Sequence, residues 1–143
     1  MTEEAIDILD DNEEGFFLMV EAAHIDKFSH NQDIDGAVKQ VEALNKAVEY
    51  AVKYAEEDGS TLIIVTADHE TGSVVYDEGN GGYYCTTDGH SSANVPLFVS
   101  DAQAGFKDGK AVENRQIPVQ TALCLGARKY AFPACIATLG KKD

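Results

Sequence analysis

Two short apolar runs, separated by a long helical stretch, decide the fold of this 143-residue chain. The first opens the segment GFFLMVEAAHIDKFSH (residues 15–30), and it is continuously apolar until it ends at Glu21. The second opens the segment TLIIVTADHETG (residues 61–72), and it is rich in β-branched side chains until it reaches Asp68. Runs of this kind are typical of short strands that are buried on both faces of a parallel sheet.

The stretch between the two runs predicts a helix. Apolar residues recur at three- and four-residue steps from Asp33 to Asp58, and Gly59 follows as a C-terminal stop. The order strand, helix, strand predicts a βαβ unit, in which the two strands run parallel. The predicted fold class is therefore α/β, with a parallel-sheet core that contains a βαβ unit and is flanked by helices.

The rest of the chain adds shorter elements to this core. A β-hairpin excursion is expected after the second run, because two alternating segments enclose a turn-rich stretch with several glycines. A segment with a single proline near its start predicts one further strand. No internal repeat or domain linker interrupts the chain, so we expect a single domain. The additional predicted elements are a helix at 2–11, the hairpin strands at 73–76 and 83–86, a strand at 95–99 and a helix at 117–128.

The charge balance limits the classes of partner. The chain has 11 Lys and Arg against 25 Asp and Glu, which gives a formal net charge of −14. Such an acidic chain repels phosphate backbones, so nucleic-acid binding is not expected, whereas cations are favoured partners. No apolar stretch approaches the roughly 20 residues of a membrane span, and the first thirty residues lack the pattern of a secretion signal.

Candidate metal ligands follow both apolar runs. Glu21 and Asp68 are expected at the same carboxyl edge of the sheet, where α/β proteins place their sites. Asp26 and His30 share one face if their segment is helical, because four residues separate them. The mixture of nitrogen and oxygen donors suits Zn²⁺, and the remaining carboxylates suit Mg²⁺. The candidate ligands are Glu21, Asp26, His30, Asp68, His69 and His90.

Three motifs in these segments resemble those of alkaline phosphatases: EAAHIDKFSH (residues 21–30), TADHETG (residues 66–72) and GHS (residues 89–91). The resemblance implies part of the alkaline phosphatase fold and hydrolysis of phosphate monoesters with zinc and magnesium. It also implies a role for each candidate ligand. Asp26, His30 and His90 would bind a first zinc ion, Asp68 and His69 a second, and Glu21 magnesium.

Two features of that family have no match in this sequence. The family's nucleophilic serine follows an aspartate, but the chain has no Asp-Ser dipeptide. The family also has an arginine that binds the phosphate, but the two arginines of this chain, Arg115 and Arg128, both lie late in the sequence and away from the motifs. We therefore expect residues 1–143 to be the C-terminal portion of an alkaline phosphatase domain, without the N-terminal portion that bears the nucleophile. Such a chain is expected to be inactive alone, and the full-length protein is expected to be periplasmic or secreted. Apolar surface left uncovered by the missing portion would favour a homodimer or other self-association.

Two other functions remain open at this point. The chain could be a non-catalytic metal-binding or interaction domain that has kept the ligands and lost the nucleophile, which the upstream sequence of the gene would decide. It could also belong to another hydrolase of the superfamily that acts on diesters or sulfates. The Glu21 to His30 pattern disfavours the latter.

Overall fold

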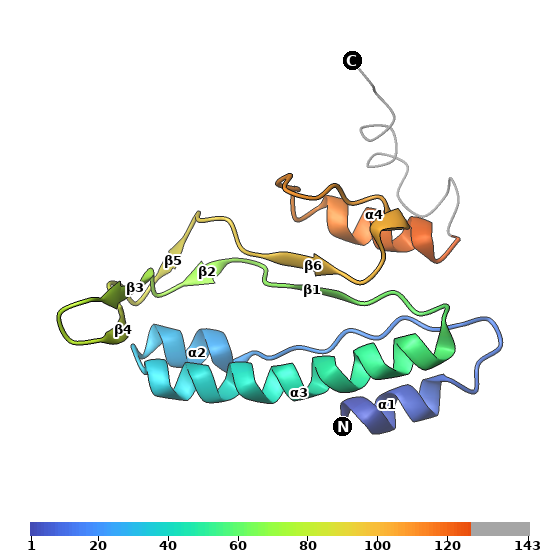
Figure 1. Ribbon diagram of the computed structural model, residues 1–143, viewed down its shortest axis with the longest axis horizontal. Helices are drawn as coiled ribbons and strands as arrows, with labels where there is room; N and C mark the ends of the chain where they lie inside the picture. The colour runs from blue at the N-terminus through green and yellow to red at the C-terminus, as the bar shows by residue number, and fades with distance from the viewer. Residues whose placement is uncertain (127–143) are drawn as a thin grey trace, which may run out of the picture.

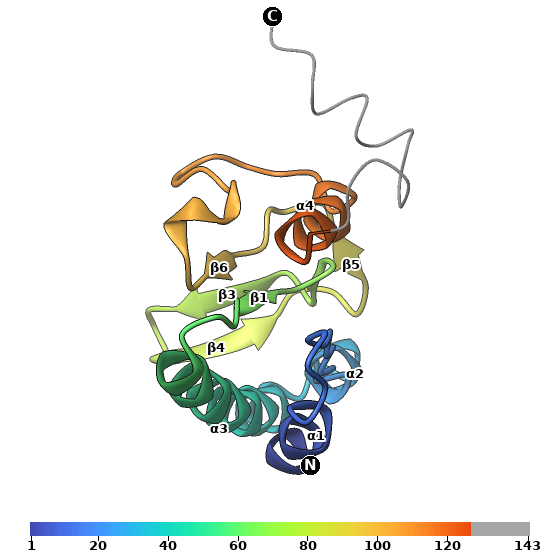
Figure 2. The same cartoon turned by 90° about the vertical axis from the view of Figure 1, so that its right-hand side faces the viewer.

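The computed structural model describes residues 1–126 and arranges them in layers. Three helices, α1 to α3, form one layer, the strands lie against it, and α4 lies on the opposite side of the strands (Figures 1 and 2). The mixed α/β class predicted from the sequence is confirmed. Helical and strand segments both contribute to the region where the candidate ligands lie.

The helices lie close to where the sequence predicts them. Helix α1 spans Thr2–Leu9, α2 spans His24–His30 and α3 spans Ile34–Asp58. Helix α3 begins where the Asp33 side chain accepts a hydrogen bond from the Gly36 amide at 2.9 Å, and it ends at Gly59 with φ +73°. Glycine adopts this left-handed conformation without the steric cost of a Cβ. Helix α4 spans Gln116–Cys124, and the predicted helix end at 127–128 lies outside the described residues.

The strands of residues 1–126 pair two by two, and every pair is antiparallel. Strand β1 (Ile64–Thr66) pairs with β6 (Leu97–Val99), so the predicted strands at 61–66 and 95–99 are present as shorter elements. Strand β3 (Val74–Asp77) pairs with β4 (Gly82–Cys85), which confirms the hairpin excursion. Two short strands that the sequence did not predict, β2 (Glu70–Thr71) and β5 (His90–Ser91), also pair. A short 3-10 turn follows at Ala102–Ala104.

The predicted parallel pairing of the βαβ unit is absent from the described residues. Residues 16–22 and strand β1 do run in the same direction, from the C-terminal end of α3 toward its N-terminal end (Figure 1). The first segment is extended, but no strand ladder within residues 1–126 includes it. Phe16 and Leu18 are half-buried, whereas Phe17 and Met19 are exposed. The run is apolar enough for a strand buried on both faces, but only one of its faces is covered here.

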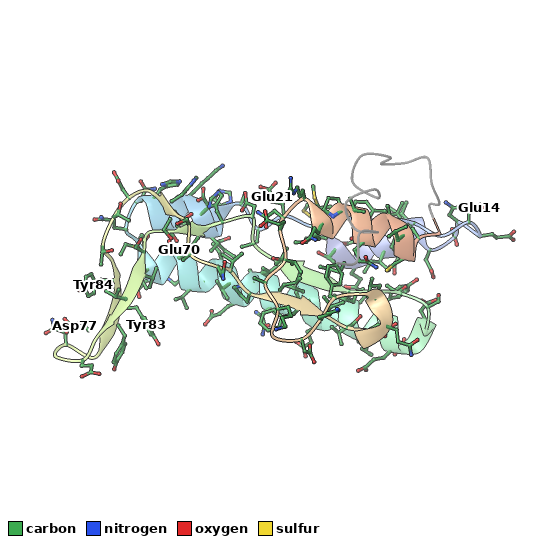
Figure 3. All side chains as sticks on the ribbon, turned by 90° about the horizontal axis from the view of Figure 1, so that it is seen from above. Glu14, Glu21, Glu70, Asp77, Tyr83 and Tyr84 are labelled. Atoms are coloured by element: carbon green, nitrogen blue, oxygen red, sulfur yellow. The ribbon has the colours of Figure 1, made fainter. Side chains whose placement is uncertain are left out.

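The core of the described residues is thin. Its buried apolar side chains are small or medium in size and come from separate elements: Ile6, Ala37, Cys85, Ala104 and Val119. Many large apolar side chains stay exposed, including Phe17, Met19 and Tyr83, which are 64%, 77% and 64% exposed. Figure 3 shows Asp77, Tyr83 and Tyr84 at one end of the molecule and Glu14 at the other. None of the helices in the described part is both long and apolar enough to cross a membrane.

Candidate metal centre

Helix α2 and the β2–β5 pair bring the candidate ligands together. Asp26 and His30 lie four residues apart on α2, as the spacing predicts for two side chains on one helix face. His90 lies on β5, and the antiparallel register places it opposite Thr71 of β2. His69 directly precedes β2. Four of the six predicted ligands therefore come from segments that are packed against one another.

The donor atoms of these side chains form a tight cluster around the Asp26 carboxylate. Asp26 Oδ1 lies 3.3 Å from His30 Nε2 and 3.5 Å from His90 Nε2. The two histidine Nε2 atoms are 3.0 Å apart. The imidazole rings of His69 and His90 are stacked with their centroids 3.6 Å apart. Donor atoms of Asp26, His69 and His90 all lie within 4.8 Å of one another.

The orientation of His30 is set by the backbone. Its Nδ1 atom lies within hydrogen-bond distance of the Asp88 carbonyl oxygen, which can only accept. In the neutral imidazole, Nδ1 therefore carries the proton and Nε2 keeps its lone pair. That lone pair faces Asp26 and His90, and a hydrogen bond of this kind on the outer nitrogen is typical of histidines that bind metals.

Hydrogen bonding keeps the Asp26 side chain ionised. The Thr71 hydroxyl donates to Asp26 Oδ1 at 2.7 Å. This bond holds the pKa of Asp26 below its ordinary value, and the neighbouring His30, His90 and His69 lower the pKa further when they are charged. Partial burial opposes this shift. A carboxylate kept in its charged form is the state that a metal ion requires.

The cluster fits Zn²⁺ by donor type and by spacing. Zinc binds imidazole nitrogen and carboxylate oxygen at about 2.0–2.2 Å in tetrahedral geometry, so two of its ligand atoms lie about 3.3 Å apart. The three distances among Asp26 Oδ1, His30 Nε2 and His90 Nε2 are 3.3, 3.5 and 3.0 Å. The side chains present can therefore hold this ion with little rearrangement.

Asp68 lies at the edge of the cluster, beside His69, and Glu21 lies apart from it. The Asp68 side chain is 86% exposed, and its Oδ2 lies 3.4 Å from His69 Nε2. Its backbone carbonyl accepts a hydrogen bond from the Asn114 side chain at 2.7 Å. Glu21 lies on the extended connection before α2 and is exposed (Figure 3). Among residues 1–126, no hydrogen bond or ion pair joins Glu21 to the other candidate ligands.

Sequence reasoning missed the residues that support the cluster. Thr71 and Asp88 were not singled out, although Thr71 lies within the TADHETG motif. Glu70 was also missed, and it accepts a hydrogen bond from the Ser91 hydroxyl across the β2–β5 pair. Two residues at 70–71 and two at 90–91 are too few to show the alternation that predicts a strand. Only the motifs TADHETG and GHS pointed to these two segments.

A cluster of nitrogen and oxygen donors that could hold a metal ion, carried on an α/β scaffold, defines the class of site, and comparisons with known proteins identify the family. The family model described as alkaline phosphatase matches residues 1–130. The alkaline phosphatase of Escherichia fergusonii is 47% identical over 75 residues, which are 52% of this chain and 16% of that protein. The chain belongs to the alkaline phosphatase family.

Solved structures agree with this assignment. The alkaline phosphatase from the Antarctic bacterium TAB5 aligns with a TM-score of 0.64 and 31% identity, over 68% of this chain and 32% of that one. A variant of the same enzyme, described as having magnesium bound, aligns with a TM-score of 0.61 and 30% identity over the same shares of the two chains. The chain thus spans about one sixth of the curated relative and one third of the solved structures.

Proposed function

We propose that the full-length protein hydrolyses phosphate monoesters and that this chain supplies its zinc ligands. The observation that carries the proposal is the convergence of Asp26, His30 and His90 at distances that suit a tetrahedral metal ion. Membership of the alkaline phosphatase family supports the reaction class. Zinc, when bound, would polarise a phosphoryl oxygen and provide a nucleophilic hydroxide at neutral pH.

The ligands divide among three ions in this proposal. Asp26, His30 and His90 hold the first zinc ion, and their mutual distances support this set. Asp68 and His69 hold the second, supported by the 3.4 Å separation of Asp68 Oδ2 and His69 Nε2. Glu21 holds magnesium, on the strength of its place in the motif. A TAB5 alkaline phosphatase structure described as having magnesium bound supports the choice of ion.

We infer that this chain does not catalyse the reaction alone. Two serines lie in the motif segments, and both hydroxyls are already engaged. Ser29 is buried and donates to the Ile25 carbonyl at 2.9 Å, while Ser91 donates to Glu70. Neither is placed as a free nucleophile, and neither follows an aspartate in the sequence.

The test combines metal analysis with an activity assay on the purified chain. We expect near-stoichiometric zinc by elemental analysis and no turnover of an aryl phosphate. His90→Ala should lose the zinc, while His24→Ala, which changes an exposed histidine outside the cluster, should retain it. Turnover of the aryl phosphate by the metal-loaded chain would contradict its proposed inactivity, and absence of zinc would contradict the ligand assignments.

A non-catalytic metal-binding domain is the second candidate function, favoured by the engagement of both motif serines. The upstream sequence of the gene separates the two candidates. An Asp-Ser segment encoded before residue 1 would support the phosphatase, whereas its absence would support the non-catalytic domain.

The exposed apolar side chains support self-association as a homodimer or larger species. Phe17 and Met19 are 64% and 77% exposed on a segment whose backbone joins no ladder within residues 1–126. Exposed apolar surface and unpaired strand edges both favour association. Light scattering would test this, because a monodisperse monomer would contradict it.

Phosphate monoesters are the proposed small-molecule partners. The net charge of −14 argues against nucleic acid as a partner. Export of the full-length protein is proposed from the family alone.

A further inference from the structure

The Thr71 hydroxyl lies between two candidate metal ligands that come from different segments. Its Oγ1 atom is 2.7 Å from Asp26 Oδ1 on helix α2 and 3.2 Å from His69 Nδ1 before strand β2. Thr71 is only partly exposed, and its own strand is fixed by pairing with β5. The hydroxyl is therefore held in place by backbone that is independent of α2.

The protons in this group can be assigned from the chemistry of the partners. A hydroxyl has one hydrogen, and an ionised carboxylate can only accept, so the hydrogen of Thr71 goes to Asp26. Thr71 Oγ1 must then accept the second bond, which requires a proton on His69 Nδ1. In the neutral ring this leaves the lone pair on His69 Nε2. The Asp68 carboxylate, whose Oδ2 lies 3.4 Å from Nε2, would favour the opposite tautomer, but that contact is longer than the 3.2 Å contact between Nδ1 and Thr71, and the Asp68 side chain is 86% exposed. The result is a continuous donor chain from His69 through Thr71 to Asp26.

The same threonine is also tied to a third ligand. Thr71 lies opposite His90 in the antiparallel register of β2 and β5. The following residue, Gly72, donates its amide hydrogen to the Gly89 carbonyl at 2.9 Å, next to His90 in the sequence. The backbone at Thr71 and the backbone at His90 are therefore held as one unit.

We propose that Thr71 is the positioning residue of the metal centre, which fixes the Asp26 carboxylate and selects the His69 tautomer whose Nε2 is free to bind a metal ion. This role rests on the proposed metal-binding function. Outer hydrogen-bond partners of this kind orient ligands and typically contribute 10- to 100-fold, as an order of magnitude, to metal affinity.

The first test reads the tautomer directly and needs no metal. Long-range ¹H–¹⁵N NMR of the histidine rings in the metal-free chain should show His69 mainly in its Nδ1–H form. Thr71→Val keeps the shape but removes the hydroxyl, so the Nδ1–H population should fall, and Thr71→Ser should restore it. An Nε2–H form of His69 in the unsubstituted chain, or no change in Thr71→Val, would overturn the proposal. The tautomer of His69 in the unsubstituted chain decides the proposal even if a variant does not fold.

The second test separates the role of Thr71 from the metal site itself. Zinc affinity, measured by chelator competition, should fall about 10- to 100-fold in Thr71→Val and stay within about threefold in Thr71→Ser. Equal affinity of Thr71→Val and the unsubstituted chain, with binding lost in His90→Ala, would overturn the role of Thr71 and leave the metal site standing. Failure of the unsubstituted chain to bind zinc would overturn the metal site and, with it, any role of Thr71 toward the metal.

Discussion

The Nε2 atoms of His30 and His90 lie 3.0 Å apart, although 60 positions separate the two residues in the sequence. One histidine comes from helix α2 and the other from strand β5. Two imidazole nitrogens gain little from facing each other unless a proton or a cation lies between them. The Asp26 carboxylate faces the same two atoms, which makes a cation the better partner.

Removal of one of these nitrogens should abolish tight zinc binding. His90→Ala deletes a donor that lies within 3.5 Å of both Asp26 Oδ1 and His30 Nε2. We expect zinc affinity to fall by more than about 100-fold, because loss of a direct ligand should exceed the effect of an outer hydrogen-bond partner. Zinc should also raise the melting temperature of the unsubstituted chain and not that of the variant, since a ligand stabilises the state that it binds.

His24→Ala is the matched control for this prediction. His24 begins α2, is exposed, and has its ring 6.3 Å from that of Phe28, away from the cluster. Zinc affinity of this variant should equal that of the unsubstituted chain. Equal losses of affinity in the two variants would contradict a specific site at His90.

Gly72 should be the least replaceable glycine near the metal centre. Its φ of +93° strains any other residue, and an added Cβ would lie 2.7 Å from Cys85 Sγ. We expect Gly72→Ala to lower the free energy of unfolding by more than the roughly 1–3 kcal/mol of backbone strain alone. Gly59→Ala provides a comparison, because φ is +73° there but nothing lies within 4 Å of the added Cβ. Urea unfolding of both variants tests this prediction. Equal losses of unfolding free energy in the two variants would show that the contact with Cys85 adds nothing.

Helix α3 should depend on Asp33 more than on its acidic neighbour. The Asp33 side chain accepts the Gly36 amide hydrogen at 2.9 Å, and its own amide donates to the Phe28 carbonyl of α2 at 2.9 Å. Asp33→Ala should cost about 0.5–2 kcal/mol by removing the N-cap. Asp35→Ala removes only a first-turn charge, worth about 0.3–1 kcal/mol. Thermal unfolding compares the two, and a larger effect at Asp35 would contradict the capping role.

The sequence predicted the elements of this fold better than their pairing. Helix periodicity between Asp33 and Asp58 depends only on local spacing, and α3 matches it. Strand pairing depends on which other segment is present to donate and accept hydrogen bonds. The run at 15–20 is apolar enough for a doubly covered strand, but β1 pairs with β6 and not with that run in the described residues. An apolar run alone cannot specify its partner.

In the candidate site, too, local spacing could be predicted from the sequence and tertiary contacts could not. Helical spacing placed Asp26 and His30 together, and the positions of His69 after the second apolar run and of His90 after the hairpin added these two histidines to the set of candidate ligands. The supporting contacts of Thr71 and Asp88 depend on tertiary packing of a two-residue strand and a loop, for which no periodic signal exists. Glu21 was predicted as a ligand from its place at the end of an apolar run. In the structure it is exposed, so its place in the sequence does not by itself bring it to the other candidate ligands.

The contact between α1 and α3 should weaken in alkaline solution. The Tyr54 hydroxyl of α3 donates to the Asp10 carboxylate at the end of α1, and this bond, with burial and the charges of Asp10 and Asp58, raises the pKa of Tyr54 to about 12 from 10.0. Because the folded pKa exceeds the unfolded one, the contribution to stability is complete below pH 10 and is lost as the pH rises toward 12. Tyr54→Phe should therefore be less stable than the unsubstituted chain at pH 9, and the difference should shrink by pH 11.5. Tyr50, whose pKa is also raised by burial and by Asp7, remains in both proteins, so some alkaline loss should persist in the variant. Urea midpoints at pH 9, 10.5 and 11.5 test this, and a difference that does not change with pH would show that Tyr54 ionisation is not linked to folding.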